Sequence, residues 1–127
     1  MQNFTLFHQL VGEVLKHIGF EQPALTASQE IISIEIEALF TVNFGLIDQK
    51  SWFILAGIRP TDETMDAEHY PLWLRSNQIG DSELQPIVAL DENNQLTCWL
   101  RLPLFGCDST HALAAFDAVL GTAHNLL

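Results

Sequence analysis

The chain alternates between segments with the period of a helix and segments with the period of a strand. Near the N-terminus, apolar residues recur at three- and four-residue steps within residues 3–20, which predicts an amphipathic helix. Asn3 is placed to cap its start and Gly19 to end it. The apolar stripe is wide because Leu6 and Leu10 extend it. The helix therefore either covers a broad sheet or leaves apolar surface for a partner.

The next three segments have the pattern of strands. Residues 31–36 and 40–46 alternate apolar and polar positions, with a corner between them at Glu37 and Ala38. A period of two predicts a sheet with one covered face. After a tight turn, residues 51–58 form a third strand that is apolar on both faces. We expect this strand to be central in the sheet or covered on both sides.

The second half of the chain predicts a short helix and a hairpin. Residues 67–80 form the helix, with Pro71 in its first turn and Gly80 as its stop. The hairpin joins residues 85–90 to residues 96–104 through the turn "DENN", whose asparagines tolerate positive φ. The first of these strands is apolar on both faces, so its second face needs a cover.

The last segment, residues 108–127, predicts a helix capped by Asp108 or Ser109. Its expected buried stripe consists of Leu113, Phe116, Leu120 and Leu127. The order of elements is therefore α-β-β-β-α-β-β-α. We expect one α+β domain over residues 1–127, an antiparallel sheet with helices layered on it.

The net charge of the chain limits the classes of partner that it can be expected to bind. The chain has 5 Lys and Arg residues against 16 Asp and Glu, a formal net charge of −11. A nucleic-acid binder needs the opposite sign, and an anionic membrane surface is disfavoured for the same reason. No apolar run approaches the roughly 18 residues of a membrane span, and no secretory signal is visible at the N-terminus. The 2 cysteines do not make a disulfide framework, which favours a reducing, cytoplasmic setting.

Motifs for chemistry are missing from the sequence. It contains no HExxH, no CxxC and no glycine-rich phosphate loop. Cys107 and His111 are four residues apart at a helix start, but two ligands do not make a zinc site, and a nucleophile pair would need an orienting partner. We therefore expect no catalytic residue, no metal and no cofactor; an enzyme that uses Cys107 and His111 is the weakest of the alternatives.

Large apolar residues in polar phases are the most distinctive feature. Phe53 and Leu55 oppose the apparent core face of their strand, and Trp99 lies between polar neighbours. Trp73 and Leu74 lie on a helix too short to need them. Either helices cover both faces of the sheet and these residues are core, or they form a surface for another protein.

Three segments of the chain carry a resemblance to a known family: "LTASQEIISIEIEALFTVNFGLID", "LWLRSNQIGDSELQPIVALDENNQLTCWLRLPL" and "ALAAFDAVLG". Together with the order of elements, they resemble the class I type III secretion chaperones, the Tir-chaperone-like (CesT-like) family. The most telling part is the short helix followed by a strand, a turn and a strand that ends in Leu102, Pro103 and Leu104. Pro71 is a departure that bears on the length of the second helix.

The resemblance implies a cytoplasmic bacterial homodimer that binds the N-terminal region of a secreted effector in extended form. Such a chaperone keeps the effector soluble and competent for secretion, and uses no cofactor, nucleic acid or membrane insertion. Recognition would combine strand addition with pockets for apolar side chains. The dimer interface of the family corresponds here to Leu72, Trp73, Leu74, Ile79, Ile87 and Ala89.

The expected effector contacts come from three places: the open end of the first helix, the first strand of the meander, and the phase opposite the apparent core. They are Phe4, Leu6, Phe7, Ile32, Ile34, Phe53, Leu55 and Trp99. The alternative function is a non-catalytic α+β binding or adaptor module with a small hydrophobic ligand pocket between the first helix and the sheet. A monomer that binds a small hydrophobic molecule would favour that alternative.

Overall fold

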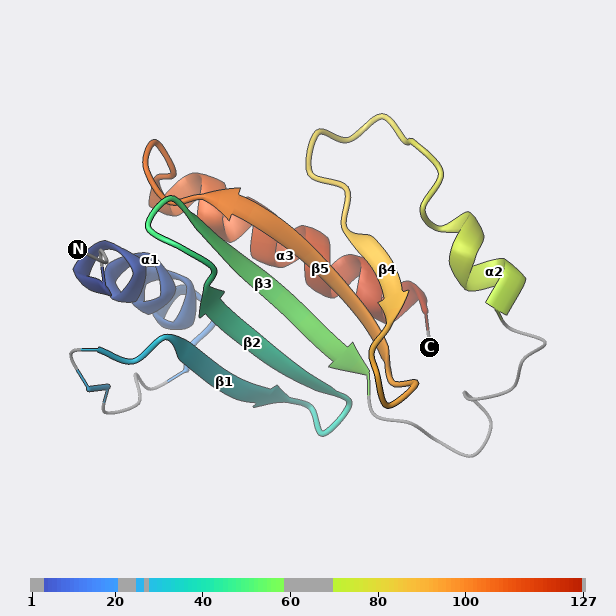
Figure 1. The fold of residues 1–127 in the computed structure, drawn as a ribbon, viewed down its shortest axis with the longest axis horizontal. Helices are drawn as coiled ribbons and strands as arrows, with labels where there is room; N and C mark the ends of the chain where they lie inside the picture. Colours follow the sequence, from blue (N-terminus) through green and yellow to red (C-terminus); the bar gives the residue numbers. More distant parts are fainter. Residues whose placement is uncertain (1–3, 21–24, 27, 59–69, 127) are drawn as a thin grey trace.

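The structure is a computed structural model that describes residues 4–20, 25–26, 28–58 and 70–126 (Figure 1). The predicted order of elements is confirmed. The elements are α1 (Phe4–His17), β1 (Ile31–Ile36), β2 (Phe40–Leu46), β3 (Ser51–Ile58), α2 (Tyr70–Arg75), β4 (Ile87–Leu90), β5 (Leu96–Pro103) and α3 (Ser109–Asn125).

The strands form one antiparallel sheet in the order β1-β2-β3-β5-β4. The expectation that β3 is central is confirmed, and the hairpin joins the meander through its second strand. Leu55 in β3 lies opposite Asn43 in β2 and Trp99 in β5, and Trp99 lies opposite Ile87 in β4. One row of side chains therefore crosses four strands on a single face.

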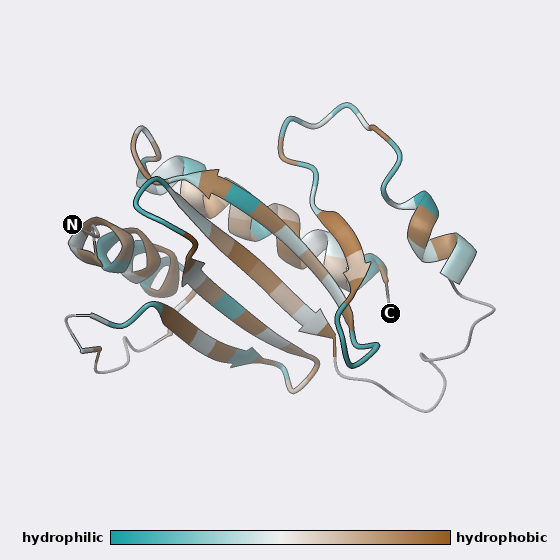
Figure 2. Cartoon of the chain, viewed as in Figure 1, coloured by the Kyte–Doolittle hydropathy of each residue, from teal (hydrophilic) through white to brown (hydrophobic). Residues whose placement is uncertain are grey.

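Helices α1 and α3 lie together on one side of the sheet, and α2 lies beside β4 (Figure 1). The core forms between those two helices and the sheet. The Phe7 ring packs edge-on against Trp52 with ring centroids 6.1 Å apart, and Phe44 stacks on Phe116 at 6.0 Å. Burying each such side chain contributes on the order of 1.5–3 kcal/mol. Figure 2 shows β3 brown along most of its length, as expected for a central strand.

Two helix ends follow the capping rules that the sequence indicated. Gly19 has a φ of 83°, and the Phe20 N–H donates to the Leu15 carbonyl at 2.9 Å, which closes α1. At the start of α3, the Asp108 carboxylate accepts the His111 N–H at 2.7 Å. Asp108 is therefore the N-cap, rather than Ser109.

Helix α2 ends at Arg75, earlier than the stop predicted at Gly80. After it, the N–H groups of residues 76–78 donate to carbonyls three residues back, so the chain tightens into turns. The side chain of Asn77 binds the backbone of Val88. The predicted residues 67–69 of this helix lie outside the described residues.

The buried stripe of α3 differs from the predicted one. Phe116 is buried as expected, but Leu113 and Leu120 are half-buried on the flank of the helix, and Leu127 lies outside the described residues. The rest of the stripe consists of Ala112, Ala115, Val119 and Ala123. These side chains are small, so the helix axis lies close to the sheet. We predicted leucines for this stripe because large apolar side chains are the usual core residues. The distance between the helix and the sheet, which favours small side chains here, does not follow from the sequence pattern.

Candidate functional site

The face of the sheet that α1 and α3 leave uncovered holds a band of apolar side chains. Because side chains alternate along a strand, Phe53 and Leu55 point away from the buried Trp52 and Ile54. Their neighbours on this face include Trp99, which is half-buried, and Ile87, which is 46% exposed. We call Phe53, Leu55, Trp99 and Ile87 the apolar band; it crosses β3, β5 and β4.

A glycine shapes one end of the band. Gly45 in β2 lies opposite Phe53, and a Cβ at position 45 would overlap the Phe53 ring. The Phe53 ring therefore occupies the space above Gly45, and a larger residue at position 45 would push it away. Beyond Leu55 the face becomes polar, because the Ser33 hydroxyl donates to the Asn43 side-chain oxygen at 2.6 Å. In the row of Leu55 the band therefore ends at β2, whereas in the row of Phe53 the exposed Ile31 continues the apolar surface past Gly45 onto β1.

The two edges of the sheet differ. The Leu46 N–H donates to the Glu30 carbonyl at 2.9 Å, and alternate residues of an antiparallel pair repeat this bonding, so Ser33 directs its backbone groups outward. Among the described residues no strand pairs with that side of β1. At the opposite edge, the Asn77 amide accepts the Val88 N–H at 2.7 Å and donates to the Val88 carbonyl at 2.8 Å. That amide occupies the place of a neighbouring strand.

A second apolar surface surrounds α2. Leu72 and Leu74 are 61% and 66% exposed, and Ile79 in the turn after the helix is 99% exposed. Exposed leucines at every second position of a short helix have no role in the core of this protomer. Trp73, in contrast, is buried and lies with Tyr70 against a cavity of about 120 Å³ beside β4.

The two thiols, Cys98 and Cys107, are both buried. Burial raises the pKa of the Cys98 thiol to about 12, and burial also raises the pKa of Cys107. Both thiols are therefore protonated at neutral pH and are poor nucleophiles. In the part of the chain that the structure describes, no three His, Cys, Asp or Glu side chains lie close enough together to hold a metal ion.

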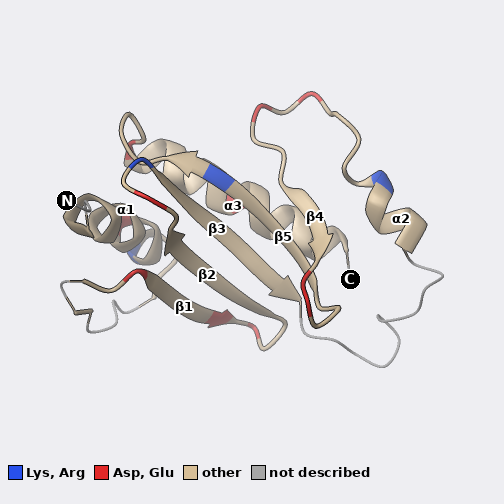
Figure 3. Cartoon of the chain, viewed as in Figure 1, with Lys and Arg blue, Asp and Glu red and all other residues tan. Residues whose placement is uncertain are grey.

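Charges lie mainly in turns and on helix surfaces (Figure 3). The band itself is uncharged, and β5 carries one cation on the same face, Arg101. On that face β1 carries an acidic residue, Glu35, at the sheet edge. An apolar centre with polar residues around it is common in protein interfaces.

The comparison of the sequence with known protein families shows to which family the chain belongs. Residues 9–127 match the Tir chaperone protein (CesT) family. The chain belongs to this family. Its membership agrees with the resemblance drawn from the pattern of strands and helices.

Solved structures of chaperone complexes share the fold of this CesT-family chain. A chain of the ExoT–SpcS complex from Pseudomonas aeruginosa matches with a TM-score of 0.71 and 13% identity, covering 96% of this chain and 97% of that one. The Yersinia pestis type III secretion chaperone SycH, in complex with a fragment of YscM2, matches with a TM-score of 0.71 and 17% identity, covering 95% and 99%. No curated protein matches the sequence significantly. None of the helices in the described residues is long and apolar enough to cross a membrane.

The CesT-family fold places the predicted effector contacts in two groups. Phe53, Leu55 and Trp99 lie half-buried on the uncovered face, and Phe4 and Leu6 are half-buried on α1. The side chains of the other three belong to the core and not to the surface; they are Phe7, Ile32 and Ile34. The backbone groups of Ile32 and Ile34 point toward β2, so neither isoleucine offers hydrogen-bonding groups at the open edge of β1.

The predicted dimer contacts also divide. The exposed ones are Leu72, Leu74, Ile79 and Ile87; Ala89 is half-buried and Trp73 is buried. Ile87 lies directly opposite Trp99, so the structure makes the two predicted sites continuous through that pair. Sequence reasoning missed Asn77 and Arg101, because neither belongs to an apolar pattern.

Proposed function

We propose that this CesT-family chain is a type III secretion chaperone that binds the N-terminal region of a secreted effector in extended form. It holds the effector soluble and competent for secretion, acts as a homodimer in the bacterial cytoplasm, and catalyses no reaction. The observation that carries the proposal is the apolar band. It lies on a sheet face that neither α1 nor α3 covers, in a member of a chaperone family.

Other chaperones of this fold support an effector as the partner. Structures with the same fold include the SycH chaperone with a YscM2 fragment and the HopA1–SchA chaperone–effector complex. The band offers side chains of the kind that dominate protein interfaces, with one tryptophan and one phenylalanine. Holding a chain extended over such a band prevents the chain from burying its own apolar residues.

The difference between the sheet edges supports pairing at β1. Strand addition needs outward-facing backbone N–H and C=O groups, which Ser33 supplies. At the β1 edge a side chain, that of Gln29, bonds the Ile31 carbonyl, whereas at β4 the Asn77 side chain bonds both outward groups of Val88, so β4 is the poorer template. An effector strand along β1 would be separated from Asn43 in β2 by one strand and from Leu55 in β3 by two strands. The same segment can then cross onto the band.

The exposed surface around α2 supports the homodimer. Leu72, Leu74 and Ile79 are exposed on neighbouring turns, and Ile87 continues this surface onto the sheet. A two-fold arrangement would bury these residues against their copies. It would also join two apolar bands into a longer track for one effector chain.

The alternative, a small-ligand module, places its pocket between α1 and the sheet. That space is filled by side chains, because Phe7, Val11 and Val14 are buried there and Phe7 packs on Trp52. The apolar cavity of about 120 Å³ lies instead between α2 and β4. No observation on the described residues favours the alternative over the chaperone.

Amide hydrogen exchange tests the proposed binding mode. The chain is co-expressed with the products of neighbouring genes, and the N-terminal fragment of the partner that co-purifies is then titrated into the isolated chain. We expect the Ser33 amide to gain strong protection on binding, while the β4 amides change little. Limited proteolysis of the bound fragment should cut it at many sites, as an extended chain requires.

Two results would contradict the proposal. A partner fragment that is compact and resists protease in the complex would mean that the chain recognises a folded domain. Protection confined to α2 and β4, with β1 and the band unchanged, would place the partner on a different surface.

A further inference from the structure

Arg101 occupies a distinctive position next to the apolar band. It lies opposite Phe53 in the register of β3 and β5, on the same face as Trp99. β4 begins at Ile87, opposite Trp99, so no strand residue covers Arg101 from that side. Among the strand residues that the structure describes, Arg101 is the only lysine or arginine on the uncovered face.

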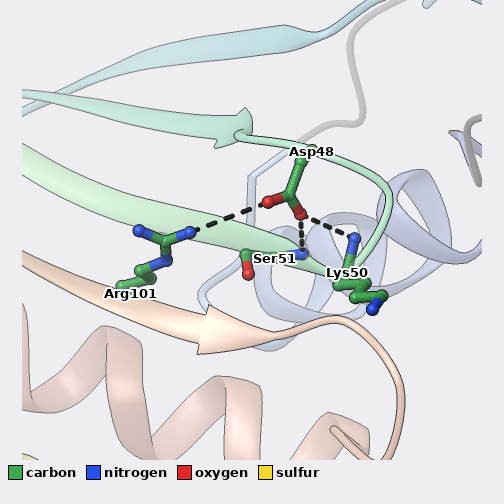
Figure 4. A network of polar contacts seen from close by, with 4 residues as sticks. All are labelled: Asp48, Lys50, Ser51 and Arg101. Carbon is green, nitrogen blue, oxygen red and sulfur yellow. Dashed lines mark hydrogen bonds and ion pairs between the residues drawn. The ribbon is translucent and has the colours of Figure 1, made fainter.

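The Arg101 guanidinium lies near the carboxylate of Asp48, which is already stabilised by hydrogen bonds from two backbone N–H groups. The Asp48 Oδ1 atom accepts the backbone N–H groups of Lys50 and Ser51 at 2.7 and 2.8 Å (Figure 4). Its Oδ2 atom lies 3.7 Å from the Arg101 Nη2 atom, and the two side chains are 53% and 56% exposed. An exposed pair at this distance is weak, because water screens it and both side chains lose freedom in forming it.

We propose that Arg101 receives a carboxylate of the bound effector segment, from an Asp or Glu that lies next to an apolar residue seated on Phe53 or Trp99. This inference rests on the proposed function and names a selectivity residue for the same surface. The weak contact with Asp48 keeps the guanidinium extended over the sheet until the partner arrives. A bidentate bond to a carboxylate on the apolar face is stronger than the resting one, because the bound segment excludes water.

A contact at Arg101 would give this acidic protein a preference for one acidic residue in the partner segment, which its net negative charge alone would not give. A net charge of −11 attracts basic segments in general and acts mainly on the rate of association. One arginine among apolar side chains instead selects a single position in the segment. The chemistry therefore fits a partner segment that is basic in its flanks and carries one acidic residue at the band.

A charge exchange tests this assignment. Synthetic peptides that tile the N-terminal region of the co-purifying partner are titrated against the wild-type chain and against Arg101→Glu. We expect the tightest-binding peptide to contain an Asp or Glu beside an apolar residue, and Arg101→Glu to weaken it about tenfold or more. Changing that acidic residue of the peptide to Lys should weaken binding to the wild type and restore it with Arg101→Glu.

Two further variants make the result specific. Lys16→Glu changes the net charge equally at an exposed position on α1, on the opposite side of the sheet from the band, and should lower affinity by less than about threefold. Asp48→Asn retains an oxygen for the two turn amides and releases Arg101, so affinity should not fall. Equal losses for Arg101→Glu and Lys16→Glu, or no restoration by the exchanged peptide, would overturn the assignment while leaving the chaperone function standing. Failure of every peptide and of the whole fragment to bind the wild type would overturn both.

Discussion

The side-chain amide of Asn77 pairs with the backbone of Val88 as a neighbouring strand would, with N···O distances of 2.7 and 2.8 Å. Asn77 follows the short helix α2, and Val88 lies in the edge strand β4. The pair fixes the turn after α2 to the sheet and also satisfies backbone groups at the sheet edge. Such edges are otherwise templates for aggregation.

Replacing Asn77 with Ala should therefore destabilise the fold and expose the edge. Leaving the part-buried Val88 amide and carbonyl without partners costs about 1–3 kcal/mol. Urea unfolding should show this loss, and light scattering should show aggregation at concentrations where the wild type is clear. Asn93→Ala removes an asparagine from the exposed β4–β5 turn and serves as the control. Equal stability of the two variants would mean that the amide does not protect the edge.

We expect the proposed dimer to depend on the exposed residues of α2 and not on Trp73, which is buried in the protomer. Leu74→Glu places a charge at a position that is 66% exposed in the protomer, so it should leave the fold intact. A standard interface removes about 800 Å² per partner, and a buried charge there would prevent association. Sedimentation should show a wild-type dimer and a Leu74→Glu monomer with equal helix content.

Leu39→Glu, at another exposed leucine in the β1–β2 turn, should remain dimeric. Trp73→Glu is a poorer test, because Trp73 is only 5% exposed and a charge there should unfold the protomer. A wild-type chain that sediments as a monomer at micromolar concentration would contradict the proposed dimer.

The β1–β2 turn contains two residues in the left-handed region, Glu37 at φ 54° and Ala38 at φ 56°. A residue with a Cβ pays roughly 1 kcal/mol there relative to glycine. Ala38→Gly should therefore stabilise the protein by up to about 1 kcal/mol. The same substitution at Ala114, an exposed position inside α3, should destabilise it by about 1 kcal/mol. Thermal unfolding of both variants should show shifts of opposite sign, and shifts of the same sign would contradict the strained turn.

The pH dependence of stability should reveal the Asp48 turn. The hydrogen bond from the Lys50 backbone N–H, with help from Ser51 and Arg101, holds the pKa of Asp48 below its ordinary value of 3.8. The ionised form is thus favoured in the folded state, and its contribution is present above pH 3.8 and lost as the pH falls through the folded pKa. Wild type should exceed Asp48→Asn in stability at neutral pH, with the difference shrinking in acid. A difference that grows in acid would contradict this sign.

Much of the fold follows from periodicity. The alternation around Ile32 and Phe44 specified strands with one buried face, and the two-faced pattern of residues 51–58 specified a central strand. Both results reflect one physical rule, that a residue alternates faces along a strand. The helix caps at Gly19 and Asp108 could be predicted from the sequence because they depend on residues that are close together in the chain.

The candidate site could be predicted less completely from the sequence, because it depends on contacts between segments that are distant in the chain. The Asn77–Val88 pair and the position of Phe53 over Gly45 both require the final register of the sheet. Trp73 could not be assigned to core or surface, because a helix of 6 residues is too short to display a face. Ile87 joins the band only through its register with Trp99, which no local pattern contains.

The affinity of the partner's N-terminal fragment for single-site variants tests the central claim most directly. Trp99→Ala removes the central member of the apolar band, and Phe105→Ala removes a 58% exposed aromatic from the loop after β5. Titration calorimetry on variants of unchanged melting temperature should show a loss of about 2 kcal/mol or more for Trp99→Ala. Phe105→Ala should bind as the wild type does. Equal affinity of Trp99→Ala and the wild type would contradict the claim that the band holds the effector.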